Sequence, residues 1–248
     1  MTTNSYYHRG GDVPLLGETI PENFARIAKQ FPDNEAIVSI PQNSRLTYSQ
    51  LVKETDRVAR GLLALGFSKG DRLGVWSTNN IEWLLLQLAT ARIGVVMVNI
   101  NPAYRTRELA YALQRSEVEC IVTIPSFRSS DYVNMLVELV PELQTSQPGE
   151  IRNRKLPFLE RVILYEPADP ENTQRPHSGF NTWHELLDIG EAVTPEELDN
   201  TTGELDMDDP INIQYTSGTT GFPKAVVLTH HNILNNGWFT ARAMHFTD

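Results

Sequence analysis

The amino-terminal part of the chain alternates between helical and extended patterns. Thr19 and Glu22 have the spacing of a capping box ahead of an apolar periodic run, which predicts a short helix there. The run EAIVSI, residues 35–40, has the composition of a strand, and PQNS that of a turn. A second strand is therefore expected near Arg45–Leu46.

A longer helix is predicted after this strand pair. Thr47 and Gln50 repeat the capping pattern, and Gly66 is placed to end the helix. The positions that share one helical face over this stretch are Leu51, Thr55, Val58, Ala59, Leu62 and Leu63.

The middle of the chain shows apolar runs that lack period-two alternation. Such runs indicate strands buried on both faces, and they occur at residues 72–77, 95–100 and 120–124. A helix is predicted over residues 79–93 with Gly94 as its stop, and Thr106 is expected to cap a helix over 107–116. This alternation predicts an α/β fold: a layered α/β/α arrangement whose mostly parallel sheet has helices on both faces.

Periodicity fails between Gln144 and Phe180, where proline, charge and amide residues dominate around a strand at 161–165. We expect long surface excursions there, then a short helix at WHELLDIG and an acidic connector over 191–210. The connector carries an acidic cluster: Asp206, Asp208 and Asp209. A metal site and a solvated approach to a strand both fit this cluster, and the pattern favours the solvated approach.

Composition and charge exclude some classes of partner and constrain how an anionic substrate could be bound. The 248 residues are 40% hydrophobic, as in soluble globular proteins, and carry a formal net charge of −10. This charge argues against a nucleic-acid partner, which would call for a basic stripe. An anionic substrate must instead be held by local positive features, such as backbone N–H groups, a lysine or a bound cation.

Cys120 is the only cysteine, which excludes intrachain disulfides and favours a reducing, cytoplasmic location. Neither Cys120 nor the six histidines show zinc-ligand spacing, so no metal ligands are predicted. We find no signal-peptide core and no apolar run near the roughly 20 residues of a membrane span.

The most informative stretch is SGTTGFPK, which lies between two strand-like runs, INIQYT and AVVLT. Glycines let backbone N–H groups approach an anion, hydroxyls donate to phosphate oxygens, and proline restricts the backbone before the lysine. The candidate phosphate-binding residues are Thr216, Ser217, Gly218, Thr219, Thr220, Gly221 and Lys224. A flexible hairpin without a ligand is the alternative. A Walker loop is excluded, because the lysine is not followed by Ser or Thr.

The stretch YTSGTTGFPK followed by LTHHN resembles the phosphate-binding loop of the adenylate-forming superfamily. Further similar stretches, such as LTYSQL and GDRLGVWSTNNIEW, extend over nearly the whole chain, and NPAYR and PLLGETI resemble the fatty-acyl-CoA synthetase branch. The resemblance implies that a medium- or long-chain carboxylic acid is activated by Mg-ATP (ATP with Mg2+) to an acyl-adenylate. CoA then displaces AMP. It also implies that the candidate residues grip the β- and γ-phosphates.

The resemblance covers residues 1–248 as part of a larger amino-terminal adenylation domain, and the family's carboxyl-terminal domain is absent. The chain alone is therefore expected to be inactive. Two alternatives stay open: a non-catalytic nucleotide-binding or interaction module, and an adenylating enzyme for amino or aryl acids. Where the family usually has glycine after the lysine, this chain has Ala225. The methyl group is harmless if φ is negative there and costs about 1–2 kcal/mol if φ is positive.

Other residues invite a functional interpretation. Of His230 and His231, we expect one to help cap a helix that starts near Asn232 and the other to be solvated. Packing or structural roles, rather than ligand contacts, are expected for Trp76, Trp83, Trp238 and Arg105.

Overall fold

The computed structural model describes residues 14–169, 172–216 and 223–246. In these ranges the centre of the protein is a seven-stranded sheet with the order β11-β10-β4-β3-β5-β8-β9. Every neighbouring pair is parallel except β10 and β11. The strands are β3 (Arg72–Trp76), β4 (Val96–Ile100), β5 (Cys120–Thr123), β8 (Arg161–Leu164), β9 (Phe180–Thr182), β10 (Pro210–Thr216) and β11 (Lys224–Thr229). The mostly parallel sheet is as predicted.

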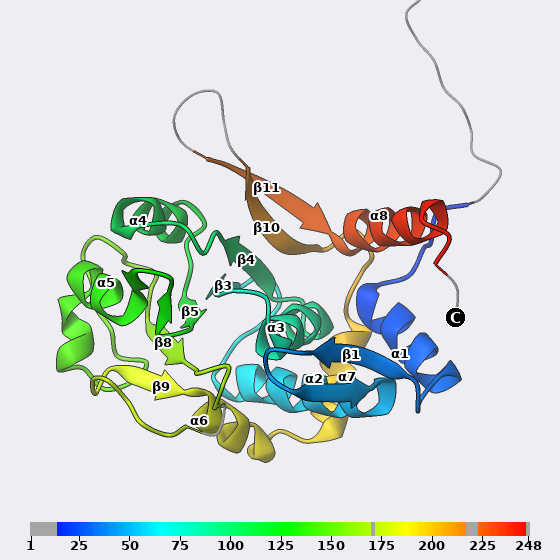
Figure 1. Ribbon diagram of the computed structural model, residues 1–248, viewed down its shortest axis with the longest axis horizontal. Helices are drawn as coiled ribbons and strands as arrows, with labels where there is room; N and C mark the ends of the chain where they lie inside the picture. The colour runs from blue at the N-terminus through cyan, green and yellow to red at the C-terminus, as the bar shows by residue number, and fades with distance from the viewer. Residues whose placement is uncertain (1–13, 170–171, 217–222, 247–248) are drawn as a thin grey trace, which may run out of the picture.

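Helices cover both faces of this sheet, which confirms the layered arrangement. Figure 1 shows α4 and α5 on one side and α2 and α3 on the other. The helices are α1 (Ile20–Gln30), α2 (Tyr48–Ala64), α3 (Ile81–Arg92), α4 (Thr106–Arg115), α5 (Tyr132–Leu139), α6 (Trp183–Ile189), α7 (Pro195–Gly203) and α8 (His230–Ala243). None of these helices combines the length and apolar character that a bilayer crossing requires.

Burial explains why the central strands lack alternation. All four residues of β5 are buried, as are four of the five in β3. Helices lie over both faces, so side chains that point either way enter an apolar layer. Trp76 ends β3 in this core, where its ring stacks on Tyr132 with centroids 3.5 Å apart.

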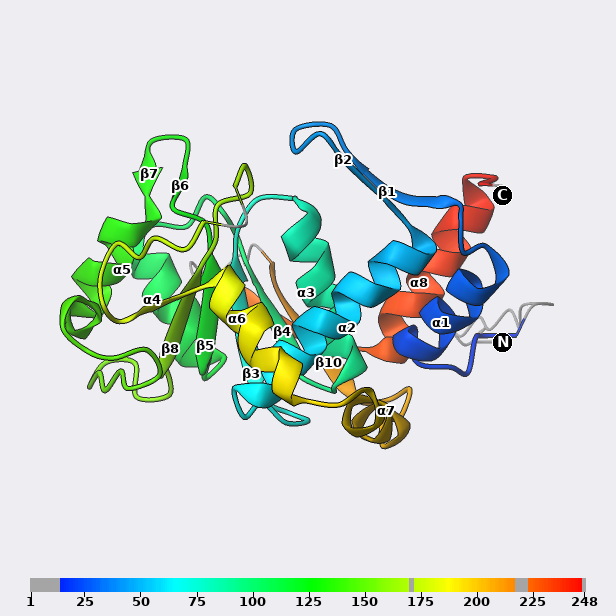
Figure 2. The ribbon, with the colours of Figure 1, turned by 90° about the horizontal axis from the view of Figure 1, so that it is seen from below.

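The local capping signals at the amino terminus are confirmed. Thr19 with Glu22 forms a capping box on α1, and Thr47 with Gln50 forms one on α2. Between them, β1 (Glu35–Ser39) and β2 (Ser44–Thr47) form the expected antiparallel pair. Figure 2 shows this pair extending from one end of α2. Gly94 ends α3 with a φ of 71°, as the sequence predicts.

Two predictions about the helices are wrong in detail. Arg105, not Thr106, is the N-cap of α4, and the Glu108 carboxylate accepts the Arg105 backbone N–H at 3.2 Å. Thr106 is the first helical residue, and its hydroxyl donates to Glu138 on α5 at 3.2 Å. Helix α5 itself was not predicted, although Asp131 caps it by accepting the backbone N–H of Asn134.

The segments expected to be irregular are more ordered than their composition suggests. Residues 144–160 are not purely a surface excursion, because Ile151, Leu156 and Leu159 are buried there. The acidic connector likewise contains α7, which a Thr194 capping box starts. Buried contacts and a cap therefore order stretches whose average composition is polar.

Gly61 in α2 is required by close packing, since a Cβ there would lie 2.3 Å from the backbone oxygen of Leu186 on α6. Gly237 in α8 has no atom within 4 Å of the corresponding position. We predict that Gly61→Ala destabilises the protein by 2 kcal/mol or more, on the order of a severe packing defect. Gly237→Ala should stabilise it by roughly 0.5–1 kcal/mol through helix propensity.

Urea unfolding of both variants checks this pair. A stabilised Gly61→Ala variant would show that α2 and α6 are not packed as described.

Candidate functional site

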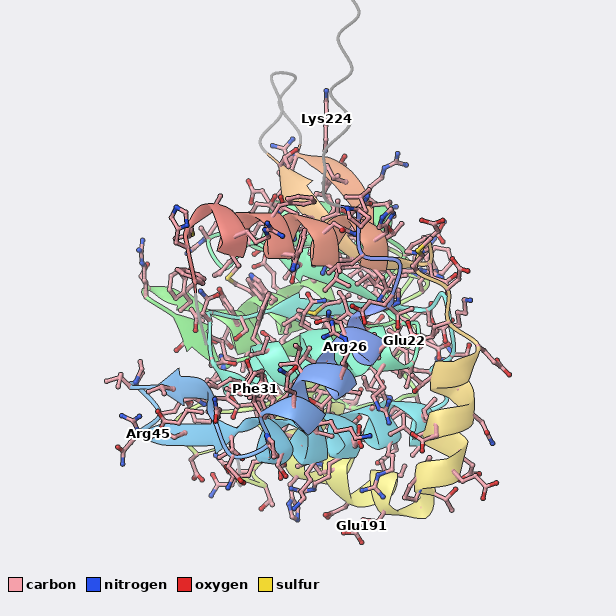
Figure 3. All side chains as sticks on the ribbon, turned by 90° about the vertical axis from the view of Figure 1, so that its right-hand side faces the viewer. Glu22, Arg26, Phe31, Arg45, Glu191 and Lys224 are labelled. Carbon is pink, nitrogen blue, oxygen red and sulfur yellow. The ribbon has the colours of Figure 1, made fainter. Side chains whose placement is uncertain are left out.

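The predicted loop is the turn of an antiparallel hairpin at one end of the sheet. Thr216 ends β10 and is paired with Lys224, the first residue of β11. Both residues are exposed, and Figure 3 shows Lys224 directed away from the body of the protein. The other candidates, Ser217, Gly218, Thr219, Thr220 and Gly221, lie outside the described residues.

The backbone conformation at Ala225 shows whether an alanine in place of the usual glycine is strained. It lies within β11, paired with Tyr215, and is not among the described residues with positive φ. An alanine methyl group is compatible with this extended backbone. The substitution therefore does not strain the chain next to Lys224.

Two tyrosines attach the loop end of the hairpin to α4. The Tyr215 hydroxyl lies 2.7 Å from the Ser116 hydroxyl and donates to the backbone oxygen of Ala112 at 3.1 Å. The Tyr111 hydroxyl donates to the backbone oxygen of Pro223 at 3.4 Å. Burial raises the pKa of Tyr215, so the phenol stays a neutral hydrogen-bonding group. These contacts hold both strands next to the loop.

A hollow of about 430 Å³ lies beside the hairpin, at the carboxyl ends of β3, β4 and β10. Open parallel sheets bind ligands at this edge. Its lining is polar but uncharged, with two aromatic rings: Ser77, Asn79, Trp83, Asn99, Ile100, Asn101, Pro102, Gln214 and Tyr215. An anion bound here would therefore obtain its charge complement from Lys224 and from backbone N–H groups.

A row of three amides, of which the middle one is fully buried, leads from this hollow into the core. Asn99 donates to Asn212 at 3.2 Å, and Asn212 donates to Gln87 at 2.9 Å. Asn212 is fully buried. The side-chain oxygen of Asn99 is also buried and has no hydrogen-bond partner among the described residues. Asparagine within two otherwise apolar strands was the available sequence signal, and it was missed.

The two histidines differ from their predicted roles. Thr229, not a histidine, caps α8 by accepting the Asn232 backbone N–H, and the helix begins at His230. His230 is fully buried, and its Nδ1 accepts the Ile20 backbone N–H at 3.3 Å. His231 is partly exposed, with its Nδ1 3.7 Å from the Asp208 carboxylate. The first histidine is thus a buried core residue and the second an edge residue.

Structural roles are observed for Trp76 and Arg105. The Trp76 indole donates to the backbone oxygen of Asn101, and the Arg105 guanidinium donates to Ser130 at 2.7 Å. Trp238 packs edge-on against Phe239 on α8. Trp83 is partly buried and packs against the hydrophobic core, as predicted, and it also lines the hollow.

The acidic cluster forms a turn before β10. Asp209 accepts the Asp206 backbone N–H and pairs with Lys69 at 2.6 Å, while Asp206 accepts the Asp208 backbone N–H. Within the described ranges, no group of three or more His, Cys, Asp or Glu residues is arranged to hold a metal ion. These carboxylates organise the turn and its ion pair.

The chain was compared with known protein families, curated proteins and solved structures. Residues 24–247 match the family described as AMP-binding enzyme. The mitochondrial medium-chain acyl-CoA ligase ACSF2 of Danio rerio is 38% identical over 238 residues, which cover 96% of this chain and 38% of that protein. The ACSF2 of Rattus norvegicus is 41% identical over 233 residues, covering 94% and 37%. The chain thus spans less than two fifths of these relatives.

A solved structure shows the same fold. The long-chain-fatty-acid-CoA ligase FadD1 of Archaeoglobus fulgidus superposes with a TM-score of 0.70 at 23% identity. The match covers 98% of this chain and 42% of that chain.

The strand position of Ala225 leads to a prediction about the missing glycine. We expect Ala225→Gly to lower the free energy of unfolding by roughly 0.5–1 kcal/mol, because glycine loses more backbone freedom in a strand. We expect no gain in ATP affinity. Urea unfolding and calorimetric titration with ATP measure the two quantities. A gain in affinity would indicate that the alanine methyl group obstructs the site.

His230 leads to a prediction about acid stability. Burial lowers its pKa from 6.5 to about 4, so unfolding increases proton uptake between these pH values. The stabilising contribution is complete above pH 6.5 and is lost as the pH falls towards 4. The loss attributable to His230 should reach up to about 3 kcal/mol. Urea unfolding of wild type and His230→Asn across this range should show a difference that shrinks in acid. A constant difference would contradict the prediction.

Proposed function

The chain belongs to the AMP-binding enzyme family, and on that premise we propose that it supplies the phosphate-binding part of an acyl-CoA ligase. The observation that supports the proposal is the hairpin, in which Thr216 is paired with Lys224. The hairpin lies beside an uncharged hollow at the carboxyl edge of the sheet. An ammonium about 4 Å from a phosphate oxygen contributes roughly 4 kcal/mol at a near-surface dielectric.

The proposed reaction has two steps. A carboxylate oxygen attacks the α-phosphorus of ATP, forming the acyl-adenylate as the bond to the β-phosphate oxygen breaks and pyrophosphate leaves. The CoA sulfur then attacks the acyl carbon, and AMP leaves with the electron pair of the broken carbon–oxygen bond. In the first step, Lys224 and the loop from Thr216 to Gly221 would hold the departing phosphates, which is catalysis by positioning and charge stabilisation.

Mg2+ would be bound through ATP. Magnesium usually keeps several waters and binds through substrate phosphates with one or two carboxylates. The uncharged lining of the hollow fits a metal ion that enters with the nucleotide. The metal would supply charge neutralisation on the phosphates.

The proposed acid is a fatty acid of medium or long chain. The two ACSF2 relatives are named for medium-chain acyl groups, which supports a fatty acid over an amino or aryl acid. The alternative of a non-catalytic nucleotide-binding or interaction module remains, because the chain spans only part of those proteins. We retain the cytoplasm as the proposed compartment, on the basis of the single buried thiol of Cys120.

Nucleotide binding tests the role of the hairpin. We expect Lys224→Ala to weaken the binding of Mg-ATP by 10-fold or more, since a hydrogen bond to a charged group contributes about 1.5–3 kcal/mol. Lys53→Ala is the matched control, because Lys53 is an exposed lysine of α2 that lies outside the site. Calorimetric titration measures both. Equal affinities of the two variants would remove the hairpin from the binding site.

An ATP–pyrophosphate exchange assay with a panel of fatty acids tests the chemistry. We expect no robust exchange from this chain alone, because it spans less than two fifths of the acyl-CoA ligases that it resembles. Binding of Mg-ATP without pyrophosphate exchange supports the proposal that this chain supplies only the phosphate-binding part of the enzyme. Robust exchange would refute it, and a folded chain that neither binds nor exchanges would favour the interaction module.

A further inference from the structure

The amino-terminal segment, residues 14–20, contacts α8 although more than 200 residues separate them. The Leu16 backbone N–H donates to the Asn235 side-chain oxygen at 2.8 Å, and the Asn235 side-chain N–H donates back to the Leu16 backbone oxygen at 3.1 Å. Asn235 is 6% exposed and also donates to the His231 backbone oxygen. Its side chain thus pairs with the segment as a neighbouring strand would.

His230 makes a second contact between the same elements. Ile20 is the first residue of α1, so its backbone N–H has no acceptor within that helix. The buried Nδ1 of His230 accepts this N–H at 3.3 Å. An accepting Nδ1 requires the neutral ring with its proton on Nε2.

These contacts bear on the hairpin because α8 follows β11 directly. The hairpin is paired to the rest of the sheet over only three residues, Asn212–Gln214 against β4. Among the strands that the structure describes, β11 pairs only with β10, and Val227 on it is 54% exposed. Figure 1 shows the hairpin extending beyond the sheet, with α8 lying against the amino-terminal elements. The far end of β11 is paired through Thr229 with Pro210, and the next two backbone N–H groups donate to the Asp209 and Met207 oxygens. The contacts of α8 with residues 14–20 add a second support at this end.

We propose that His230 and Asn235 are positioning residues, which fasten the amino-terminal segment to α8 and thereby hold β11 and Lys224 at the angle that phosphate binding requires. This inference rests on the proposed function of the hairpin. Tyr111 and Tyr215 fix the loop end of the hairpin to α4. At the other end, the contacts with residues 14–20 add to the backbone bonds of Thr229, His230 and His231.

The charges around His230 come from three elements. Asp206 and Asp209 lie before β10, Glu22 lies on α1, and Lys69 lies before β3. Lys69 is paired with Asp209, which offsets part of the negative charge. Protonation of His230 Nδ1 would place its N–H against the Ile20 backbone N–H, and two donors cannot form a hydrogen bond with each other. The contact between residues 14–20 and α8 should therefore also be lost in acid.

Matched variants on α8 test the fastening. Asn235→Asp keeps the acceptor for Leu16 and replaces the donor with an oxygen that repels the Leu16 and His231 carbonyls. Asn236→Asp adds the same charge at the next position, which is exposed. We expect hydrogen exchange in residues 14–20 to accelerate at least 10-fold in Asn235→Asp and to stay unchanged in Asn236→Asp. Unchanged exchange in both would overturn the fastening.

A second pair of variants introduces no buried charge, so it tests the same contact if Asn235→Asp fails to fold. His230→Phe keeps a flat ring and removes the acceptor, whereas His230→Asn keeps an acceptor near the Nδ1 position. Exchange should accelerate in His230→Phe and be largely restored in His230→Asn. Equal exchange in the two variants would mean that the hydrogen bond to Ile20 does not matter.

The positioning of the hairpin is measured by two further readouts on the same variants. Spin labels at Val227 and Lys53, both exposed, should give a narrow distance distribution in wild type and a broad one in Asn235→Asp. Mg-ATP affinity should fall at least five-fold in Asn235→Asp and not in Asn236→Asp. An opened segment with an unchanged distribution would overturn the positioning role. A wild-type chain that does not bind Mg-ATP would refute the proposed function. Hydrogen exchange in residues 14–20 and the spin-label distances would still test whether these residues are held to α8.

Discussion

The site depends on β10 pairing with two neighbours of opposite direction. Its parallel pairing with β4, from Asn212 to Gln214, carries the strand past the end of β4 towards the carboxyl edge of the sheet. Its antiparallel pairing with β11 brings Lys224 opposite Thr216 at that edge. A further parallel neighbour would have needed a long crossover connection. The antiparallel neighbour brings a lysine back opposite a threonine hydroxyl.

Electrostatics at this edge are local. The chain carries a formal charge of −10, and its field opposes an anionic ligand at long range. The hollow beside the hairpin is lined by amides, hydroxyls and rings without formal charge. In the proposed function, Lys224 would therefore meet a phosphate beside a hollow whose lining offers no competing carboxylate.

Buried polar groups connect the site to the core. Asn212 holds Asn99 and Gln87 in a row between β4, β10 and α3, and His230 and Asn235 join α8 to residues 14–20. Such groups are costly to bury unless their partners are in place. Each also fixes one arrangement of its elements, which favours a single geometry around the hairpin over several similar ones.

The sequence by itself determined the features that act over a few residues. The capping boxes at Thr19 and Thr47, the buried strands and the two strands that flank residues 217–222 follow from short-range geometry and composition. Tertiary structure decided that Ala225 is extended and that His230 is buried rather than a cap. It also brought Leu16 to Asn235. These outcomes depend on partners distant in the chain, because only the folded protein sets which polar groups lose water and which acceptors replace it.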